Sequence, residues 1–366
     1  MREWIYLSAI QRCDKHVYNQ SIGTKDCIRS INTIIYTMKK ITLFKKGALA
    51  LSLLLVGGCA KNNETDPSIT NIAVTNPDFQ MLEDAAIRGD VAVPLGNKNP
   101  SDPQGNYTVF APTNAAFARL GLNKAEDLAV LNTAFLRNTL FYHVFSGTLP
   151  GSTLTPGSAS ASALGPTRRI IRRADGSLYV NGSKILGTDV RAANGLIHPI
   201  DKVLLATGGN IVESAQALQN AQVFVKPELT FLVAAVVKCN LAGALSAVGP
   251  YTVFAPTDQA FVAAGIPSVD AINKMTPSQV QDLTNILLNH VLANSSSASL
   301  GNKFTPELPE SVTVTPLGGR PLQLGAFTNG VLTVKGASNT IPANMVIPDV
   351  QCTNGVVHVI DRILLP

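Results

Sequence analysis

Tyr107-Thr108-Val109-Phe110-Ala111-Pro112-Thr113 is the stretch that decides the fold, and the same seven residues return at Tyr251–Thr257. The first four residues are aromatic or β-branched, which favours a strand. Pro112 ends that strand because proline lacks the N–H that a sheet ladder needs. Thr113 or Asn114 can then cap a helix that carries Phe117 on its buried side. Each copy is therefore predicted to form a strand-to-helix corner.

Each corner has a closing partner further along the chain. The first is Asn194-Gly-Leu-Ile-His-Pro-Ile-Asp201-Lys-Val-Leu-Leu205, and the second is Asn354-Gly-Val-Val-His-Val-Ile-Asp361-Arg-Ile-Leu-Leu365. The two openings lie 144 residues apart and the two closings 160. Units of this length indicate duplicated domains, because solenoid repeats run only about 20–50 residues.

These motifs, with a histidine after an apolar helix in the middle of each unit, resemble the fasciclin domain family. The resemblance covers residues 76–206 and 208–366. It implies an α+β fold with two tandem fasciclin-like domains, each a wedge of two β-sheets with helices packed around it. No cofactor is expected.

Apolar spacing predicts the main helices. Residues 78–87 carry an apolar face at i, i+3 and i+4 spacing, and residues 128–144 continue that pattern over a longer helix. In the second domain Thr276 is a predicted N-cap, with Pro277 at the first helical position. Asp175-Gly176 predicts a hairpin turn after the Arg-rich strand.

The positive charge lies near the start of the chain. The net charge is +5, yet residues 1–58 hold 9 Lys and Arg against 3 acids, which leaves 20 basic and 21 acidic residues from Cys59 onward. Charged residues make up only 14% of the chain. This distribution argues against a nucleic-acid partner, because a protein that binds nucleic acid needs a basic surface on its folded domains.

Residues 38–58 are predicted to be a lipoprotein signal peptide. Met38-Lys-Lys begins a basic segment, and residues 47–58 form an apolar run of 12 residues, shorter than the about 20 that span a bilayer. The run ends in Leu55-Val-Gly-Gly-Cys59, which resembles a bacterial lipoprotein signal and makes Cys59 the predicted lipidation site. Residues 1–37 are interpreted as an over-extended gene start, and residues 59–75 as a flexible tether.

Acyl chains on Cys59 would hold the protein on a membrane without a transmembrane helix, because each buried methylene contributes about 0.8 kcal/mol. Ala60 after the cysteine resembles the sorting pattern for the outer membrane. The predicted location is the bacterial outer membrane, lipid-anchored, and either exposed on the surface or facing the periplasm.

Four histidines occupy matched places: His143 and His290 follow the long helices, and His198 and His358 lie in the closing strands. No metal or catalytic site is predicted, because each place has one histidine and no Cys, Asp or Glu at ligand spacing. His198 and Asp201 should not form a dyad, because residues three apart on a strand point to opposite faces. We expect these rings to hydrogen-bond to nearby backbone.

Tyr142-His143 matches the tyrosine-histidine segment that is associated with adhesion in fasciclin members of animal matrix proteins. The second domain has Asn289-His290 and so lacks the tyrosine. Tyr142, His143 and His290 are candidate binding residues, with a role in the core as the alternative.

Arg168, Arg169, Arg172 and Arg173 form the one concentration of charge in the two domains. Such a cluster could attract an anionic polysaccharide or a lipid headgroup. The alternative is a solvated edge strand whose charges prevent pairing with another sheet.

Cys239 and Cys352 are the two thiols that remain within the two domains. An exported protein meets an oxidising compartment, which allows a disulfide between them. Such a bridge would stabilise the fold by about 4–5 kcal/mol in the chain-entropy model. A bridged pair and two free thiols both remain open.

The expected function is that of a non-enzymatic, envelope-anchored adhesion or interaction protein that binds another protein or a glycan on a cell surface or matrix. A polysaccharide-handling accessory and a small-ligand carrier are alternatives. A glycan-active enzyme would need a cleft that unites two carboxylates from the set Asp189, Asp201, Glu213, Asp258 and Glu310.

Overall fold

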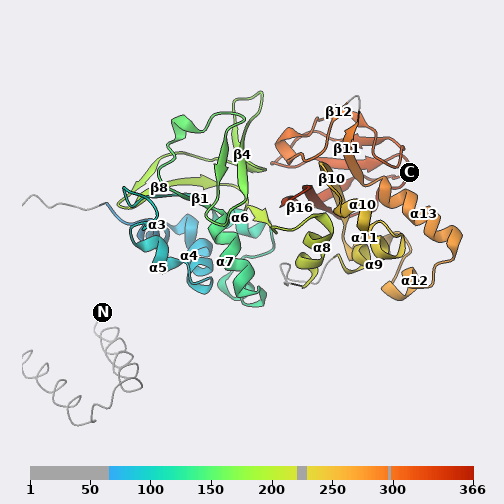
Figure 1. Ribbon diagram of the computed structural model, residues 1–366, viewed down its shortest axis with the longest axis horizontal. Helices are drawn as coiled ribbons and strands as arrows, with labels where there is room; N and C mark the ends of the chain where they lie inside the picture. Colours follow the sequence, from blue (N-terminus) through green and yellow to red (C-terminus); the bar gives the residue numbers. More distant parts are fainter. Residues whose placement is uncertain (1–65, 221–228, 296–297) are drawn as a thin grey trace, which may run out of the picture. The chain divides into compact units, whose positions relative to one another are not determined.

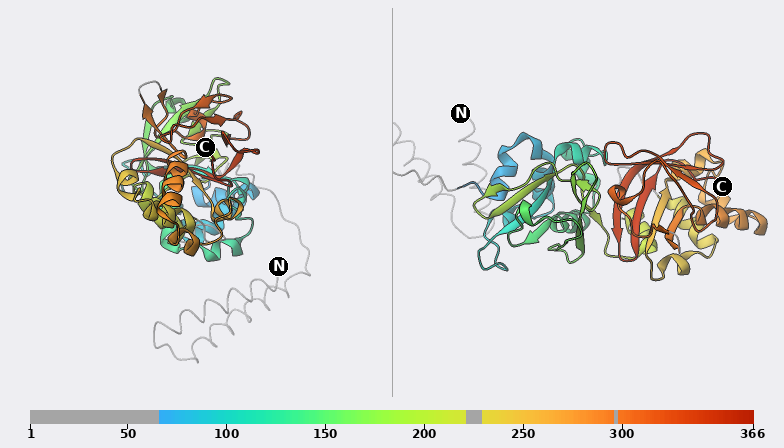
Figure 2. Two further views of the ribbon diagram at one scale, coloured as in Figure 1. Left: turned by 90° about the vertical axis from the view of Figure 1, so that its right-hand side faces the viewer. Right: turned by 90° about the horizontal axis from the view of Figure 1, so that it is seen from above.

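The computed structural model describes residues 66–220, 229–295 and 298–366, which belong to one compact unit (Figure 1). The predicted signal peptide, Cys59 and the first part of the tether lie outside the described residues. Among the residues that the structure describes, none of the helices is both long and apolar enough to cross a membrane. Two domains follow each other along the chain, and each carries its helices on one side of its sheets (Figures 1 and 2).

Domain 1 is built around strand β1 (Tyr107–Pro112). This strand lies between antiparallel β2 (Val144–Ser146) and parallel β8 (Gly195–Ile200), and β7 (Val190–Ala192) forms the far edge of the sheet. A second sheet has the order β3-β4-β5-β6. The other elements are α3 (Ile69–Thr75), η1 (Pro77–Phe79), α4 (Gln80–Arg88), α5 (Ala92–Gly96), α6 (Asn114–Ala118), η2 (Ala125–Val130), α7 (Thr133–Tyr142), η3 (Gly151–Thr153), β3 (Ala159–Ala161), β4 (Thr167–Arg172), β5 (Leu178–Val180) and β6 (Ser183–Lys184).

Domain 2 repeats this plan around β10 (Tyr251–Pro256). Antiparallel β11 (Val291–Ser295) and parallel β17 (Gly355–Ile360) flank β10, and the long β16 (Ala343–Cys352) lies next to β17. Its other elements are α8 (Ile211–Asn220), α9 (Thr230–Lys238), α10 (Ala242–Ser246), α11 (Asp258–Ala263), α12 (Val269–Asn273), α13 (Pro277–Leu288), β12 (Ala298–Ser299), η4 (Thr305–Glu307), β13 (Thr313–Val314), β14 (Leu322–Leu324) and β15 (Thr333–Gly336).

The repeated strand is buried on both faces, which explains its apolar composition. Val109 and Ala111 of β1 face the core under the helices, whereas Phe110 faces a second core between the two sheets. In domain 2, Val253 faces the helices and Phe254 faces the second core in the same way. Side chains alternate along a strand, so one strand contributes to both cores. The predicted α+β fold of two tandem domains, with helices packed on sheets, is confirmed. Domain 1 has two sheets as predicted, whereas in domain 2 the long β16 belongs to one continuous sheet of order β12-β11-β10-β17-β16-β15-β14-β13.

The Asn-Gly pair of each closing motif holds the corner strand in place. A Cβ on Gly195 would lie 1.8 Å from the carbonyl oxygen of Tyr107, so only glycine fits there. The Asn194 side chain accepts a hydrogen bond from the N–H of Ile69 and donates to the carbonyls of Leu95 and Asn97. Asn354 makes the equivalent three bonds in domain 2. The motif therefore joins the helices to the sheet.

Two expected elements differ from the structure. The end of the predicted tether, at 69–75, is helix α3, because Ser68 caps it and Ile69 and Ile72 bury one face in the core. The helix predicted over 128–144 is interrupted: η2 ends at Val130, and α7 starts after Asn132, whose side chain caps the N–H groups of Ala134 and Phe135. An asparagine that caps a helix competes with continued helix at that position.

Other local predictions are confirmed. Thr276 caps α13 through a reciprocal capping box with Gln279, and Pro277 is its first residue. The helix predicted over 78–87 is formed by η1 and α4. In domain 1 the expected cap of α6 works differently: Thr113 is the N-cap without a side-chain bond, and Asn114 accepts the N–H of Met81 at the start of α4 instead.

Candidate functional site

His143 and His290 are buried links between the long helix and the end of each domain. The Nδ1 of His143 lies 2.6 Å from the carbonyl oxygen of Thr139, and its Nε2 accepts the N–H of Leu204 at 2.9 Å. His290 bonds in the same way to the carbonyl of Ile286 and the N–H of Leu364. Burial lowers the pKa of both rings to about 4, although the bond to a carbonyl favours the proton. Both rings are therefore neutral and have both nitrogens engaged.

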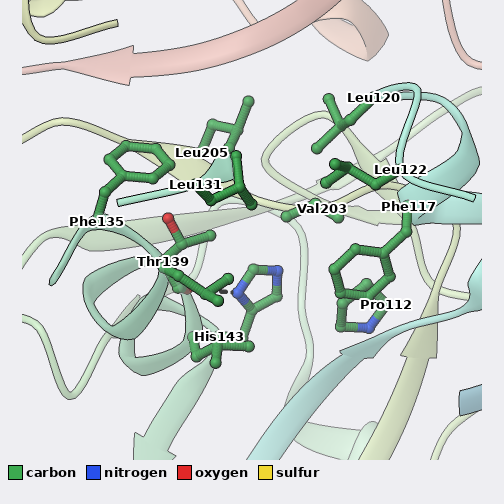
Figure 3. Close-up of a pocket in the computed structure, with 12 residues that line it drawn as sticks. Pro112, Phe117, Leu120, Leu122, Leu131, Phe135, Thr139, His143, Val203 and Leu205 are labelled. Carbon is green, nitrogen blue, oxygen red and sulfur yellow. Dashed lines mark hydrogen bonds between the residues drawn. The ribbon is translucent and has the colours of Figure 1, made fainter. Parts of the chain in front are cut away.

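Figure 3 shows the surroundings of His143 in domain 1. Its ring borders a small hollow whose wall is apolar and includes Phe117, Leu131 and Val203. The hollow measures about 20 Å³, which suits at most a single water. His143 thus belongs to the core and has no exposed face with which to meet a partner.

His198 and His358 lie in the closing strands and bond to backbone, as predicted. His198 accepts the N–H of Asp189 at Nδ1, and its Nε2 lies 2.9 Å from the carbonyl oxygen of Leu149. His358 relates in the same way to Asp349 and Lys303. Asp201, the partner that a His-x-x-Asp dyad would need, accepts the N–H of Lys184 instead.

Tyr142 is fully buried at the end of α7, and its hydroxyl reaches domain 2. The hydroxyl hydrogen-bonds to Oε1 of Gln351 and accepts Nδ2 of Asn181 at 2.7 Å. Burial raises the pKa of Tyr142, and the nearby Arg168 opposes this only in part. Asn289 stands at this place in domain 2 and cannot reach as far. The Tyr142 side chain therefore links domain 1 to domain 2 and is not exposed to a partner.

The four arginines of the cluster separate in the structure. Arg168 is buried, donates to the carbonyl of Tyr142 at 2.6 Å, and lies 5.0 Å from the centre of the Phe110 ring. Burial lowers the pKa of Arg168 to about 10. Strand β4 is an inner strand, so the interpretation of this segment as a charged edge is wrong. Arg172 alone of the four is exposed, and it donates to the carbonyl of Gly176.

Arg169 and Arg173 contact domain 2. Arg169 donates to Glu307 at 2.8 Å and lies 4.7 Å above the Phe304 ring. Arg173 donates to Glu310 at 2.7 Å and lies 3.8 Å from the centre of the Phe327 ring. An arginine that pairs with a carboxylate and stacks on an aromatic ring is held in one orientation. Two members of the predicted anion-binding patch are thus occupied between the domains.

Lys202 lies at the centre of the contacts between domain 1 and domain 2, which we call the junction. Its ammonium donates to Asp349 at 2.8 Å, to the hydroxyl of Thr305 at 3.1 Å and to the carbonyl of Gly330 at 2.5 Å. Lys202 and Asp349 are both buried. The neighbouring strand β9 (Leu205–Ala206) pairs in parallel with β16 of domain 2. A buried charge with three acceptors and a shared strand together fix the two domains against each other.

This junction was not predicted from the sequence. Lys202 and Asp349 lie far apart in the chain, and a lone lysine after a strand is usually solvated. Asp349 has a φ of +68°, which an aspartate tolerates better than most residues, but the sequence does not reveal backbone angles. The one available signal was that the fasciclin-like motif places a basic residue, Lys202 or Arg362, at the same position of each domain.

The two cysteines are free thiols, so the disulfide that remained open from the sequence is not formed. Both lie in the helix-side core of domain 2. Burial raises the pKa of Cys352 to about 12 and also raises the pKa of Cys239. Neither thiol is activated for chemistry.

The carboxylates of a hypothetical glycan-active site have separate partners. Asp189 caps Gly151, Asp201 accepts Lys184, and Glu310 pairs with Arg173. Asp258 accepts the N–H of Phe231, and Glu213 accepts that of Asn210. Within the described ranges, no three His, Cys, Asp or Glu side chains gather in a way that could hold a metal ion.

The helices of each domain border a small apolar hollow, and domain 1 also has an open hollow whose wall is partly polar. The apolar hollow between α3, α4 and α5 measures about 110 Å³, and its equivalent between α8, α9 and α10 about 40 Å³. An open hollow of about 560 Å³ on domain 1 is lined by Thr148, Pro150, Asp189 and Arg191, among others. Sites for small organic ligands are usually enclosed and about 300–1,000 Å³ in size.

Comparison with known proteins agrees with this repeated architecture. A model of the Fasciclin domain matches residues 77–206 and 227–366. The transforming growth factor-beta-induced protein ig-h3 of Sus scrofa is 31% identical over 267 residues, which covers 72% of this chain and 35% of that protein. The chain thus spans about a third of the length of this relative.

Bacterial proteins are similar to parts of the chain. Protein sll1483 of Synechocystis sp. is 36% identical over 139 residues, 38% of this chain and 73% of that protein. The immunogenic protein MPB70 of Mycobacterium bovis is 33% identical over 169 residues, 41% of this chain and 82% of that protein. Among solved structures, a FAS1 domain pair from the insect cell adhesion molecule fasciclin I aligns with a TM-score of 0.34 and 18% identity, over 71% of this chain and 89% of that one.

Proposed function

The chain belongs to the fasciclin domain family, and on this premise we propose that it is a non-enzymatic interaction protein that binds another protein or a glycan through the surfaces of its two domains. The relative ig-h3 is an animal protein, whereas MPB70 and sll1483 are bacterial. Cell adhesion is the activity that the family resemblance brings to this proposal.

The buried junction around Lys202 is the observation that carries the proposal. It joins the two domains into a body with a fixed outer surface. It also engages Tyr142, Arg169 and Arg173, three of the predicted binding residues. An interaction protein benefits from such a body, because a rigid surface loses little conformational entropy on binding. In this proposal the exposed loops and strand edges of the two domains contact the partner.

Two other classes of function find less support. An enzyme on glycans needs two carboxylates that face each other, whereas the five candidate carboxylates each bond to separate backbone or side-chain groups. A small-ligand carrier needs an enclosed apolar cavity, and the apolar hollows of about 20, 110 and 40 Å³ are below the usual size.

We also propose that the protein is anchored by acyl groups on Cys59 to the bacterial outer membrane, where it faces either the cell surface or the periplasm. The support is the sequence of residues 38–59, with a basic start, an apolar run of 12 residues and a small-residue pair before the cysteine. Anchoring by acyl chains does not require a transmembrane helix.

An adhesion assay with anchored and released protein tests this function. Bacteria that express the full chain are compared with bacteria that express Cys59→Ser, on surfaces coated with envelope proteins or with polysaccharides of the same cells. We expect the natural chain to incorporate labelled palmitate and to be found in the membrane fraction. We also expect bacteria that carry it to be retained on one of the two coatings. The variant should lose all three properties. Equal retention of both strains on every coating would contradict an adhesive role.

A further inference from the structure

The hairpin β5–β6 of domain 1 and the hairpin β15–β16 of domain 2 are equivalent, but their turns differ in length. In both, a residue at the start of the second strand, Lys184 or Asn344, donates its N–H to the aspartate of the closing motif. Two residues, 181–182, separate the paired ends of the strands in domain 1, whereas eight residues, 335–342, separate them in domain 2. The longer turn therefore has to lie over a neighbouring part of domain 2.

The short turn of domain 1 leaves room for domain 2. A Cβ on Gly182 would lie 1.9 Å from the carboxylate carbon of Asp349, the buried acceptor of Lys202. Close by, Leu205 of β9 pairs with Val350 of β16. The strand edge at the end of domain 1 is thus closed by a strand of domain 2.

The equivalent edge of domain 2 lies at Leu365. The residues that precede Leu205 and Leu365 donate their N–H groups to His143 and His290, which places the two leucines at the same position of their domains. A Cβ on Gly336, where the long turn leaves β15, would lie 2.3 Å from the carbonyl oxygen of Leu365. The long turn therefore contacts this edge directly.

Asn339 joins the long turn to the edge. Its Oδ1 accepts the N–H of Leu365 at 2.9 Å and that of Gly336 at 3.1 Å, and its Nδ2 donates to the carbonyl of Ile363 at 2.9 Å. The N–H of Ser338 donates to the carbonyl of Leu365 at 3.4 Å. The turn thus occupies the backbone N–H and C=O of Leu365, the groups that an added strand would need.

The basic residue of the closing motif also stays within domain 2. Arg362 stands where domain 1 has Lys202, directly after the aspartate of the motif. The Nε of Arg362 lies 3.9 Å from Oδ1 of Asp361, and the Arg362 side chain is 40% exposed. Lys202, by contrast, is buried against Asp349 of the other domain. The surface with which domain 1 receives domain 2 is therefore satisfied from within domain 2 itself.

We propose that residues 337–342 form a strap that closes the strand edge at Leu365 and prevents a second copy of this chain from pairing with it. An uncovered strand edge is a template on which another chain can add a strand, and natural proteins cover such edges with loops. The strap directs any binding partner to other surfaces of the two domains. This inference does not depend on what the partner is.

Hydrogen–deuterium exchange of the full chain tests the contact between the strap and the edge. Asn339→Ala removes the three hydrogen bonds of that side chain and leaves the backbone of the strap in place. The amide of Leu365 should then exchange about tenfold faster than in the natural chain. Thr340→Ala, at an exposed residue of the same strap, is the matched control and should leave the rate unchanged. Equal exchange in the natural chain and in Asn339→Ala would overturn the proposal.

Shortening of the turn tests what the strap prevents. A variant in which residues 335–342 are replaced by Asn-Gly gives domain 2 the turn of domain 1. Sedimentation velocity at several concentrations should show stronger self-association than in the natural chain. Leu365→Pro in the shortened chain should reverse this association, because proline has no N–H to offer to an added strand.

A shortened chain that keeps its circular dichroism spectrum and associates no more than the natural chain would contradict the strap, as would association that Leu365→Pro leaves unchanged. If the shortened chain does not fold, the exchange rates of Asn339→Ala and Thr340→Ala decide the question. Neither measurement uses an adhesive surface or a membrane, so their outcome is distinguishable from that of the adhesion assay.

Discussion

The ammonium of Lys202 in domain 1 lies 2.8 Å from the carboxylate of Asp349 in domain 2, and both side chains are buried. Asp349 also accepts the N–H and the hydroxyl of Thr305. Burial alone would raise the pKa of Asp349, but the charge of Lys202 and the hydrogen bonds outweigh it and hold the pKa below its usual range. Asp349 is therefore ionised in the folded state, and its bond with Lys202 joins domain 1 to domain 2.

Lys202→Met should lower the free energy of unfolding by about 3–5 kcal/mol, because it leaves the Asp349 carboxylate buried without its counter-charge. Urea unfolding at pH 7, followed by circular dichroism, measures the change. Lys274→Met is the matched control, because Lys274 pairs with Asp270 on the exposed surface of α12. The control should change stability by less than about 1 kcal/mol. Equal effects of the two substitutions would contradict a buried pair.

Stability should fall as the pH drops from about 6.5 to 4, because His143 and His290 are neutral in the fold. The pKa of each is lowered to about 4, whereas in the unfolded chain a histidine takes up its proton near 6.5. The unfolded state thus binds more protons across this window, which costs about 3 kcal/mol for each histidine by pH 4. Urea unfolding at several pH values measures the slope, which His143→Gln should reduce. An unchanged slope in that variant would contradict a neutral, buried His143.

Tyr142→Phe removes the hydroxyl that joins Asn181 to Gln351. We expect a loss of about 1–3 kcal/mol in the free energy of unfolding, because the two hydrogen bonds of the buried hydroxyl are lost and Asn181 Nδ2 and Gln351 Oε1 keep only the 3.1 Å bond to each other at this place. Tyr107→Phe, at the first and partly exposed residue of β1, is the control and should stay within about 0.5 kcal/mol of the natural chain. If the two variants are equally stable, the Tyr142 hydroxyl does not link the domains.

Cys239 and Cys352 should resist alkylation in the folded protein and react in denaturant without a reducing agent. Burial keeps both as protonated thiols, and both sulfurs lie in the core. Peptide mapping by mass spectrometry after alkylation in urea identifies each site. Recovery of the two cysteines as one disulfide-linked peptide pair would show that the bridge forms in the protein.

Much of the fold could be predicted from short local patterns in the sequence. The corner motif at Tyr107 and Tyr251, the Thr276 capping box and the hairpin at Asp175-Gly176 each follow from residues that are neighbours in the chain. The split at Asn132 was missed because the apolar spacing continues across it, although the asparagine is itself a capping residue. The helix at Ile69 was missed because it is short and depends on burial against the rest of domain 1.

The junction could not be predicted in the same way. Arg169 and Glu307 are separated by 138 positions and Lys202 and Asp349 by 147, so no local pattern relates them. A run of arginines indicates charge but not which side chains turn inward, and Arg168 turns inward onto Phe110. The tyrosine that the sequence marked as a contact residue does make a contact, but with domain 2 of the same chain.

The distance between the two domains tests the junction most directly. Spin labels at Val93 and Val248, which are 70% and 96% exposed, can be placed in a chain whose accessible cysteines are replaced by serine, and pulsed electron resonance then gives the distribution of distances. A single narrow distribution is expected for the natural junction and a broad one for Lys202→Met. A distribution that is broad in both would show that Lys202 and Asp349 do not hold the two domains together.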